Sequence, residues 1–262
     1  MLKKRTSLDI FISVIKAIFL REIKTRFGSK NLGYFWAIAE PMAFIIVFVM
    51  AKVMLFGRGG DSEYDFVVFI ASGFLVFNLF KNIVTQNMNA FTANKALFSY
   101  KQVHPLDPMF ARVLLEILIF FIITSIFVFI GWYFGYDLDV QSFNHIALAV
   151  IWIVILSFSW GLLFGVLGYY FSTLEKIIKL AMMPLMFLSA LFYSLKDMPI
   201  ELREILLYNP IIHFMEMIHG FYFEVLDDRF VDYTYMTYWT IIPLFIGLVL
   251  YIKLEKGIRT VS

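Results

Sequence analysis

Residues 26–41 read RFGSKNLGYFWAIAEP and join a basic, amphipathic stretch to a long apolar one. Before this segment, apolar residues recur at helical spacing over 8–20, with polar residues on the opposite face. This spacing predicts a helix over 8–27 that lies on a surface. Charged residues surround its last turns, from Arg21 to Arg26. A helix resting on lipid alone would keep its apolar stripe to the end, so the pattern favours a protein partner over a plain membrane-surface anchor.

The composition is that of a membrane protein. Of 262 residues, 61% are hydrophobic and 19% aromatic, and the mean hydropathy is +0.81, which excludes a soluble domain of this size. The net charge of +2 says little about partners. The chain has no cysteine, which excludes disulfides and thiolate metal sites. No small-residue cleavage site follows a short apolar core, so no removable signal peptide is expected.

The hydropathy pattern predicts six membrane spans. A helix needs about 20 apolar residues to cross the hydrocarbon core of a bilayer. Six stretches qualify, at about 32–56, 66–86, 108–134, 146–171, 177–194 and 235–254. The fifth contains Pro184, and Asn78, Lys81 and Asn82 weaken the inner end of the second, so five or seven spans stay open. We expect an all-α polytopic fold with one transmembrane domain over 1–262.

The distribution of Lys and Arg sets the orientation. With the N-terminus inside, the inner segments hold 16 of these residues and the outer segments hold 4. Positive charge favours the cytoplasmic side of short loops. Both termini are therefore predicted to face the cytoplasm.

Two of the connections between spans have a pattern of their own. The inner connection over 87–108 is long and polar, and residues 94–101 predict a short helix within it. The outer connection contains two short amphipathic helices over 196–222, broken at Asn209-Pro210. They suit a re-entrant pair that dips back into the membrane from the outer side, or a helical hairpin that lies flat on the outer surface.

The joint between the first helix and the first span resembles a known family. A basic amphipathic helix, a glycine-containing break and the motif Leu32-Gly33-x-x-Trp36-Ala37-x-x-Glu40-Pro41 are similar to the start of type-2 ABC exporter permeases that move polysaccharides. The similarity is greatest to the inner-membrane permeases of bacterial capsular polysaccharide export and extends over nearly the whole chain. It implies a place in the bacterial inner membrane and a re-entrant segment before the last span.

The chain has no nucleotide site of its own. Residues 28–33 have the glycine spacing of a phosphate-binding loop, but Tyr34-Phe35 stand where Lys and Ser or Thr are needed,. We therefore expect no cofactor on this chain, and a separate ATP-binding subunit, present in two copies, to use ATP and magnesium. The resemblance places that subunit against helix 8–27 and the inner loop. The expected contact residues are Arg21, Glu22, Lys24, Arg26, Lys95, Lys101 and His104.

No catalytic or metal site is expected. The four histidines lie on opposite sides of the predicted membrane and cannot converge on one ion,. An integral-membrane enzyme acting on lipid-linked sugars would need convergent acidic residues or histidines, and these are scattered. A proton-coupled carrier would need ionisable residues at mid-membrane, whereas the charges within the spans lie towards their ends. No nucleic-acid partner is expected either.

Aromatic residues are the main candidates for a substrate path. The chain has 31 Phe, 14 Tyr and 5 Trp, many of which suit lipid contact and the interfacial belt. Sugar rings can also stack on aromatic rings without fixed hydrogen-bond positions, as a sliding polymer requires. The candidate path residues are Tyr34, Phe35, Trp36, Phe44, Phe192, Tyr193 and Tyr208. We expect Glu40 and Pro41 to help form a gate, and Arg112 to neutralise Glu116 four residues later.

The remaining expectations concern assembly and substrate. The motif Gly161-x-x-x-Gly165, together with Gly168, permits close helix packing in the fourth span,. Six helices barely enclose a channel for a sugar chain, so a homodimer of twelve spans is expected in the bilayer. The resemblance implies export of a capsular polysaccharide with a lipid end to the periplasm, together with periplasmic and outer-membrane export components. Export of O-antigen, teichoic acid or another lipid-linked glycan is the alternative.

Overall fold

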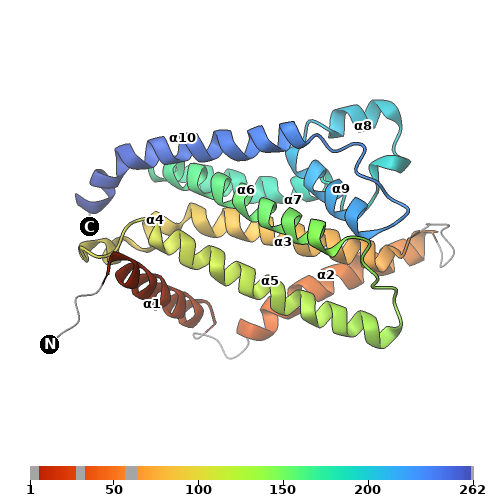
Figure 1. The fold of residues 1–262 in the computed structure, drawn as a ribbon, viewed down its shortest axis with the longest axis horizontal. Helices are drawn as coiled ribbons and strands as arrows, with labels where there is room; N and C mark the ends of the chain where they lie inside the picture. The colour runs from red at the N-terminus through yellow and green to blue at the C-terminus, as the bar shows by residue number, and fades with distance from the viewer. Residues whose placement is uncertain (1–5, 28–32, 57–63, 261–262) are drawn as a thin grey trace.

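The computed structural model describes residues 6–27, 33–56 and 64–260, and within these ranges all regular structure is helical (Figure 1). This confirms the all-α fold class. In chain order the elements are α1 (Ser7–Phe27), α2 (Gly33–Phe56), α3 (Phe66–Met88), α4 (Ala90–Ala93), the 3₁₀ helix η1 (Lys95–Ser99), α5 (Asp107–Phe134), α6 (Phe143–Tyr170), α7 (Ser172–Phe187), the 3₁₀ helix η2 (Leu195–Asp197), α8 (Ile200–Leu206), α9 (Pro210–Tyr222) and α10 (Tyr233–Thr260). The predicted helix over 8–27 and the short helix of the inner connection are both present.

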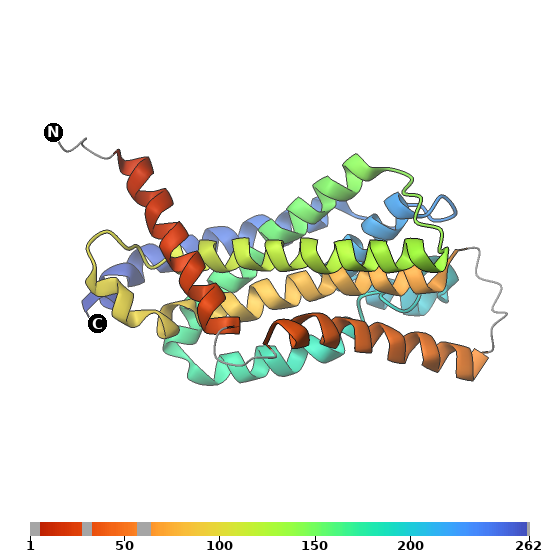
Figure 2. The ribbon, with the colours of Figure 1, turned by 90° about the horizontal axis from the view of Figure 1, so that it is seen from below.

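Helix α3 lies at the centre of the bundle. Its N-terminus is capped by Asp65, whose carboxylate accepts hydrogen bonds from the backbone N–H groups of Val67 and Val68 at 2.9 and 3.4 Å,. The helix packs against α2, α5, α6, α7 and α9. Figure 2 shows it running between α5 on one side and α2 and α7 on the other. A helix that is apolar on most faces can be enclosed in this way.

Glycines in α6 allow it to pack closely against α3. A Cβ atom on Gly161 would lie 2.8 Å from the Cβ of Asn87, and one on Gly165 would lie 3.1 Å from the Asn87 carbonyl oxygen. A side chain at either position would therefore push the helices apart. The close packing predicted for the fourth span is confirmed at Gly161 and Gly165, and the partner is α3. The prediction was wrong for Gly168, where an added Cβ atom would have nothing within 4 Å.

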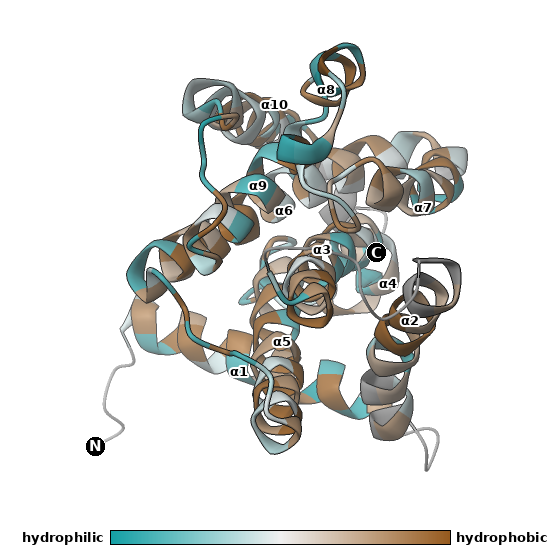
Figure 3. Cartoon of the chain, turned by 90° about the vertical axis from the view of Figure 1, so that its right-hand side faces the viewer, coloured by the Kyte–Doolittle hydropathy of each residue, from teal (hydrophilic) through white to brown (hydrophobic). Residues whose placement is uncertain are grey.

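Four helices in the described ranges are long and apolar enough to cross a membrane, namely α3, α5, α6 and the Tyr233–Glu255 part of α10. They correspond to the predicted second, third, fourth and sixth spans. Seen along the bundle, the long helices are largely hydrophobic (Figure 3). The described apolar stretch of α2 is Ala39–Ala51, and α7 has 16 residues. The count of six spans therefore stays a prediction.

The α7 helix ends at Phe187, before residue 194 where the predicted fifth span ends. The chain leaves the helix in a turn over 188–194, hereafter the 188–194 turn. Within it, Ala190 has a φ of 57°, in the left-handed region, which does not continue a right-handed helix. The side-chain amide of Asn209 donates to the Leu188 carbonyl oxygen and to the Ser189 hydroxyl, both at 2.9 Å. These bonds fix the turn against the start of α9.

Two short helices, α8 and α9, follow where the sequence predicts them. They lie at the end of the bundle opposite to the start of α1 and the end of α10 (Figure 1). Residues Ile211 to Gly220 of α9 are all buried, whereas Ile200 and Ile205 of α8 are exposed. Enclosure by protein is what a short helix within a bilayer requires. The position of the pair relative to the membrane stays a prediction.

Candidate functional site

Five phenylalanine rings meet where α2, α3, α7 and the 188–194 turn come together. We call them the aromatic cluster, which consists of Phe44, Phe48, Phe74, Phe187 and Phe192. The rings of Phe44 and Phe74 stack with centroids 4.3 Å apart, and those of Phe48 and Phe192 do the same at 4.3 Å. Phe44 and Phe192, which the sequence singled out for the path, lie 6.5 Å apart. The cluster therefore joins the first predicted span to the end of α7.

The other predicted path residues do not extend this cluster into one ladder. Phe35 and Trp36 are 60% and 62% exposed near the start of α2, Tyr193 is half-buried, and Tyr208 is 79% exposed between α8 and α9. The side chain of Tyr34 lies outside the described residues. Among the predicted path residues that the structure describes, only Phe44 and Phe192 pack ring to ring between elements. A role in the path stays a prediction for all of them.

The two predicted gate residues lie side by side in sequence within α2. Pro41 is buried and Glu40 is exposed. The helix continues through the proline although its nitrogen has no hydrogen to donate. This leaves a local weakness in the backbone of α2, about one turn before the buried side chain of Ile45,. The gating role stays a prediction.

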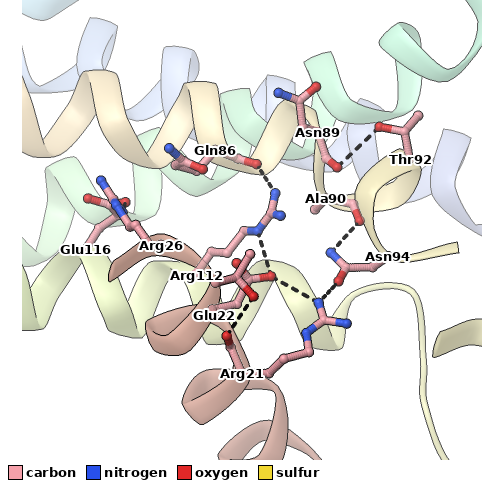
Figure 4. A network of polar contacts seen from close by, with 11 residues as sticks. Arg21, Glu22, Arg26, Gln86, Asn89, Ala90, Thr92, Asn94, Arg112 and Glu116 are labelled. Carbon is pink, nitrogen blue, oxygen red and sulfur yellow. Dashed lines mark hydrogen bonds and ion pairs between the residues drawn. The ribbon is translucent and has the colours of Figure 1, made fainter. Parts of the chain in front are cut away.

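A polar network ties the end of α1 to the bundle (Figure 4). The Glu22 carboxylate accepts from the guanidinium of Arg112 at 3.2 Å and from that of Arg21 at 3.3 Å. Arg21 also donates to the side chain of Asn94, and Arg112 to the carbonyl oxygen of Gln86. Charge-assisted bonds of this kind are stronger than neutral ones. The network thus connects α1, α3 and α5 with one another, and connects α1 with Asn94, which follows α4.

A second ion pair joins α1 to α5. Arg26 pairs with Glu116, whose side chain is only 2% exposed. The expectation that Arg112 and Glu116 neutralise each other was wrong, because each of them pairs with a residue of α1 instead. Two charged residues four apart on a helix can bind each other, but buried charges take the partners with the best geometry. The sequence did contain a signal for these pairs, because Glu22 and Arg26 at the end of helix 8–27 have charges opposite to those of Arg112 and Glu116.

The predicted contacts with the ATP-binding subunit fall into two groups. Arg21, Glu22 and Arg26 are used within the chain, as described above. The others lie on the surface at the end of the bundle that carries α1, where Lys24, Lys95 and Lys101 are exposed. Lys95 lies 5.7 Å from the ring centroid of Tyr169, and His104 lies 3.5 Å from the carboxylate of Glu255 in α10. Their role in binding a partner stays a prediction.

A further polar contact at the same end joins α7 to α3. Glu175, in the first turn of α7, accepts from the Lys179 ammonium and from the Asn89 amide at 2.9 Å. The hydrogen bond from Lys179, followed by that from Asn89, lowers the pKa of Glu175,. The carboxylate therefore stays charged and holds the start of α7 beside the end of α3.

The histidines have structural surroundings. Both ring nitrogens of His213 face backbone groups, Nε2 towards the Leu207 carbonyl oxygen at 2.9 Å and Nδ1 towards the Asp232 N–H at 3.2 Å. His219 is buried and stacks on Phe69 at 3.8 Å. Within the described part of the chain, no three side chains of His, Asp or Glu are placed to hold a metal ion.

Comparison with known proteins defines the class of this helical bundle. Residues 13–223 match the model of the ABC-2 type transporter family, and the chain belongs to that family. It is 32% identical to the polysialic acid transport protein KpsM of Escherichia coli, over 98% of this chain and 99% of that protein. It is 28% identical to the capsule polysaccharide export inner-membrane protein CtrC of Neisseria meningitidis, over 97% and 95%. A more distant relative, the O-antigen export system permease protein RfbA of Klebsiella pneumoniae, is 25% identical over 80% of each chain.

Proposed function

We propose that this chain is the membrane subunit of an ATP-driven exporter that moves a capsular polysaccharide, carrying a lipid end, from the cytoplasm to the periplasm. The observation that carries the proposal is the similarity along almost the full length to KpsM and CtrC, whose names specify polysialic acid transport and capsule polysaccharide export. The more distant similarity to RfbA keeps another lipid-linked glycan, such as O-antigen or teichoic acid, as the second candidate.

Energy would come from two copies of a separate ATP-binding subunit that holds ATP and magnesium. Its docking surface would be the end of the bundle that carries α1, where Lys24, Lys95 and Lys101 are exposed. The internal pairs of Arg21, Glu22 and Arg26 would then transmit its movement to the long helices. A lever of this kind needs a firm connection between α1 and α5, which the network in Figure 4 supplies.

The path for the glycan would run along the aromatic cluster, between two copies of the chain in the bacterial inner membrane. Helices α2 and α7 flank the cluster and expose apolar side chains, with Met54 at 77% and Leu180 at 78%. Exposed apolar surface of this kind suits either lipid or a second helix bundle. Six spans, cytoplasmic termini and a re-entrant pair formed by α8 and α9 complete the proposed topology. Periplasmic and outer-membrane export components would receive the polymer.

The test is deletion of the gene in its native host, with complementation by the native chain. Loss of surface polysaccharide, with the polymer accumulating in the cytoplasm, supports export and supplies the substrate for chemical analysis. Accumulation of O-antigen or teichoic acid would select the second candidate. Normal surface polysaccharide in the deletion strain would overturn the proposal. A truncated or unmodified polymer at the surface would also overturn it, and would indicate that the chain is an enzyme acting on the polymer.

A further inference from the structure

A polar stripe runs along the inner half of α3, within a predicted membrane span. It consists of Asn78, Lys81, Asn82 and Thr85, at offsets of three, four and seven residues, which places them on one face of the helix. All four are half-buried. The other faces of the same stretch are apolar and buried, at Leu79, Phe80, Ile83 and Val84. The stripe is thus the one polar face of the helix at this level.

The stripe continues the face that carries the aromatic cluster. Phe74 precedes Asn78 by one turn and stacks on Phe44 of α2 at 4.3 Å. Lys81 lies seven residues, two turns, further towards the end that carries α1, or about 10 Å along the helix. One face of α3 therefore changes from aromatic to polar and cationic between the centre of the bundle and its inner end.

The polar groups of the stripe are available to a ligand. Among the described residues, the side chains of Asn78, Lys81 and Asn82 have no hydrogen-bond or ion-pair partner. The Thr85 hydroxyl donates to the Lys81 carbonyl oxygen at 2.8 Å. Asn78 and Asn82 also border Glu116 across a crevice of about 10 Å³, which has room for about one water molecule,. Amide and ammonium groups are costly next to hydrocarbon without a partner, which indicates a polar occupant.

The charge of the stripe selects between ligands. Glu116 is paired with Arg26, so the unpaired charge next to the two amides is the Lys81 ammonium. Amides donate to and accept from hydroxyl groups, and an ammonium attracts a carboxylate or a phosphate. We propose that the stripe is the binding surface for the glycan at the inner end of the path, and that Lys81 makes it selective for an acidic, hydroxyl-rich polymer. This inference rests on the proposed function and names the substrate class.

The test is a binding measurement on the full-length chain in phosphatidylcholine nanodiscs. The probes are fluorescent oligosialic acid and a neutral malto-oligosaccharide of equal length. We expect the acidic probe to bind roughly three- to tenfold more tightly. Lys81→Gln should remove this preference, Lys81→Arg should keep it, and Lys253→Gln, which removes an exposed lysine of α10, should leave it unchanged. Equal binding of both probes to the native chain, or an unchanged preference in Lys81→Gln, would overturn the inference.

Two further experiments distinguish a glycan site from a lipid headgroup site, and distinguish failure of this inference from failure of the proposed function. The same measurement with phosphatidylglycerol in the nanodiscs tests whether a lipid headgroup occupies the stripe. An unchanged preference supports the glycan, whereas loss of the preference overturns the inference in favour of the headgroup. In the native host, the Lys81→Gln strain is compared with the deletion strain. If the Lys81→Gln strain exports normally and the deletion strain does not, the inference is overturned and the proposed function stands. A deletion strain with normal surface polysaccharide sinks the proposed function itself.

Discussion

The guanidinium of Arg26 in α1 pairs with the carboxylate of Glu116 in α5, 90 residues further along the chain. The pair joins an amphipathic helix at the end of the bundle to one of its long apolar helices. Because the Glu116 side chain is almost fully buried, loss of its partner leaves a charge that water cannot reach easily. This relationship makes α1 part of the bundle and not an appendage on its surface.

Reversal of either charge should destabilise the chain, and reversal of both should restore it. We expect Arg26→Glu or Glu116→Arg to lower the free energy of unfolding by about 2 kcal/mol, less than for a fully buried pair because Arg26 is partly exposed. Arg26→Glu with Glu116→Arg should recover most of the loss. Thermal unfolding in detergent measures the effect, with Lys24→Glu as the control on the exposed side of α1. Additive losses in the double variant would show that the two residues do not act as a pair.

Reversal of exposed charges near η1 should weaken binding of the ATP-binding subunit and leave the fold intact. Lys95→Glu with Lys101→Glu should reduce affinity for that subunit by roughly tenfold, with an unchanged midpoint of thermal unfolding. Arg229→Glu, at the opposite end of the bundle, is the control. Pull-down with the purified subunit measures binding. Unchanged affinity would remove these lysines from the docking surface.

Reversal of the α1 charges that pair within the chain should affect export more than binding of the ATP-binding subunit. Arg21→Glu with Arg26→Glu should uncouple the partner from the long helices, so export should fall more steeply than partner binding. Surface polysaccharide and partner affinity are measured side by side in the same strain. If both stay at the native level, the lever proposed for α1 is incorrect.

The α6–α3 contact predicts a matched pair of glycine substitutions. A Cβ atom at Gly161 meets the Asn87 side chain at 2.8 Å, whereas one at Gly168 meets nothing within 4 Å. Gly161→Val should therefore cost about 1–3 kcal/mol more than Gly168→Val, although both change the helix propensity equally. Unfolding in detergent gives the comparison. Equal losses would mean that α6 does not pack on α3 as described.

The aromatic cluster can be tested by cross-linking, because the native chain has no cysteine. Phe48→Cys with Phe192→Cys should be joined by a short, reducible bis-methanethiosulfonate cross-linker, since the two rings stack with centroids 4.3 Å apart. The cross-link should stop export, and a reductant should restore it. Val47→Cys with Phe192→Cys is the control, because Val47 faces outwards at 60% exposure. Full export by the cross-linked chain would exclude movement at the cluster as a part of transport.

The periodicity of apolar residues in the sequence was sufficient to predict much of the fold. Apolar runs predicted the long helices, the spacing over 8–20 predicted α1, and Asn209-Pro210 predicted the break before α9. The end of α7 was missed because the bond from Asn209 to the 188–194 turn joins residues in different elements. For the same reason Phe74 and Phe187 were not predicted beside Phe44. Spacing along one helix finds neighbours on its own face, and only the packing of helices brings the others together.

The most direct measurement is transport by the purified chain and its ATP-binding subunit in sealed vesicles, with labelled lipid-linked polysaccharide extracted from the deletion strain. We expect ATP and magnesium to drive the polymer across the bilayer into a protected compartment, and omission of either subunit to abolish this movement. Transport without the ATP-binding subunit, or none with both subunits present and ATP being hydrolysed, would contradict this expectation.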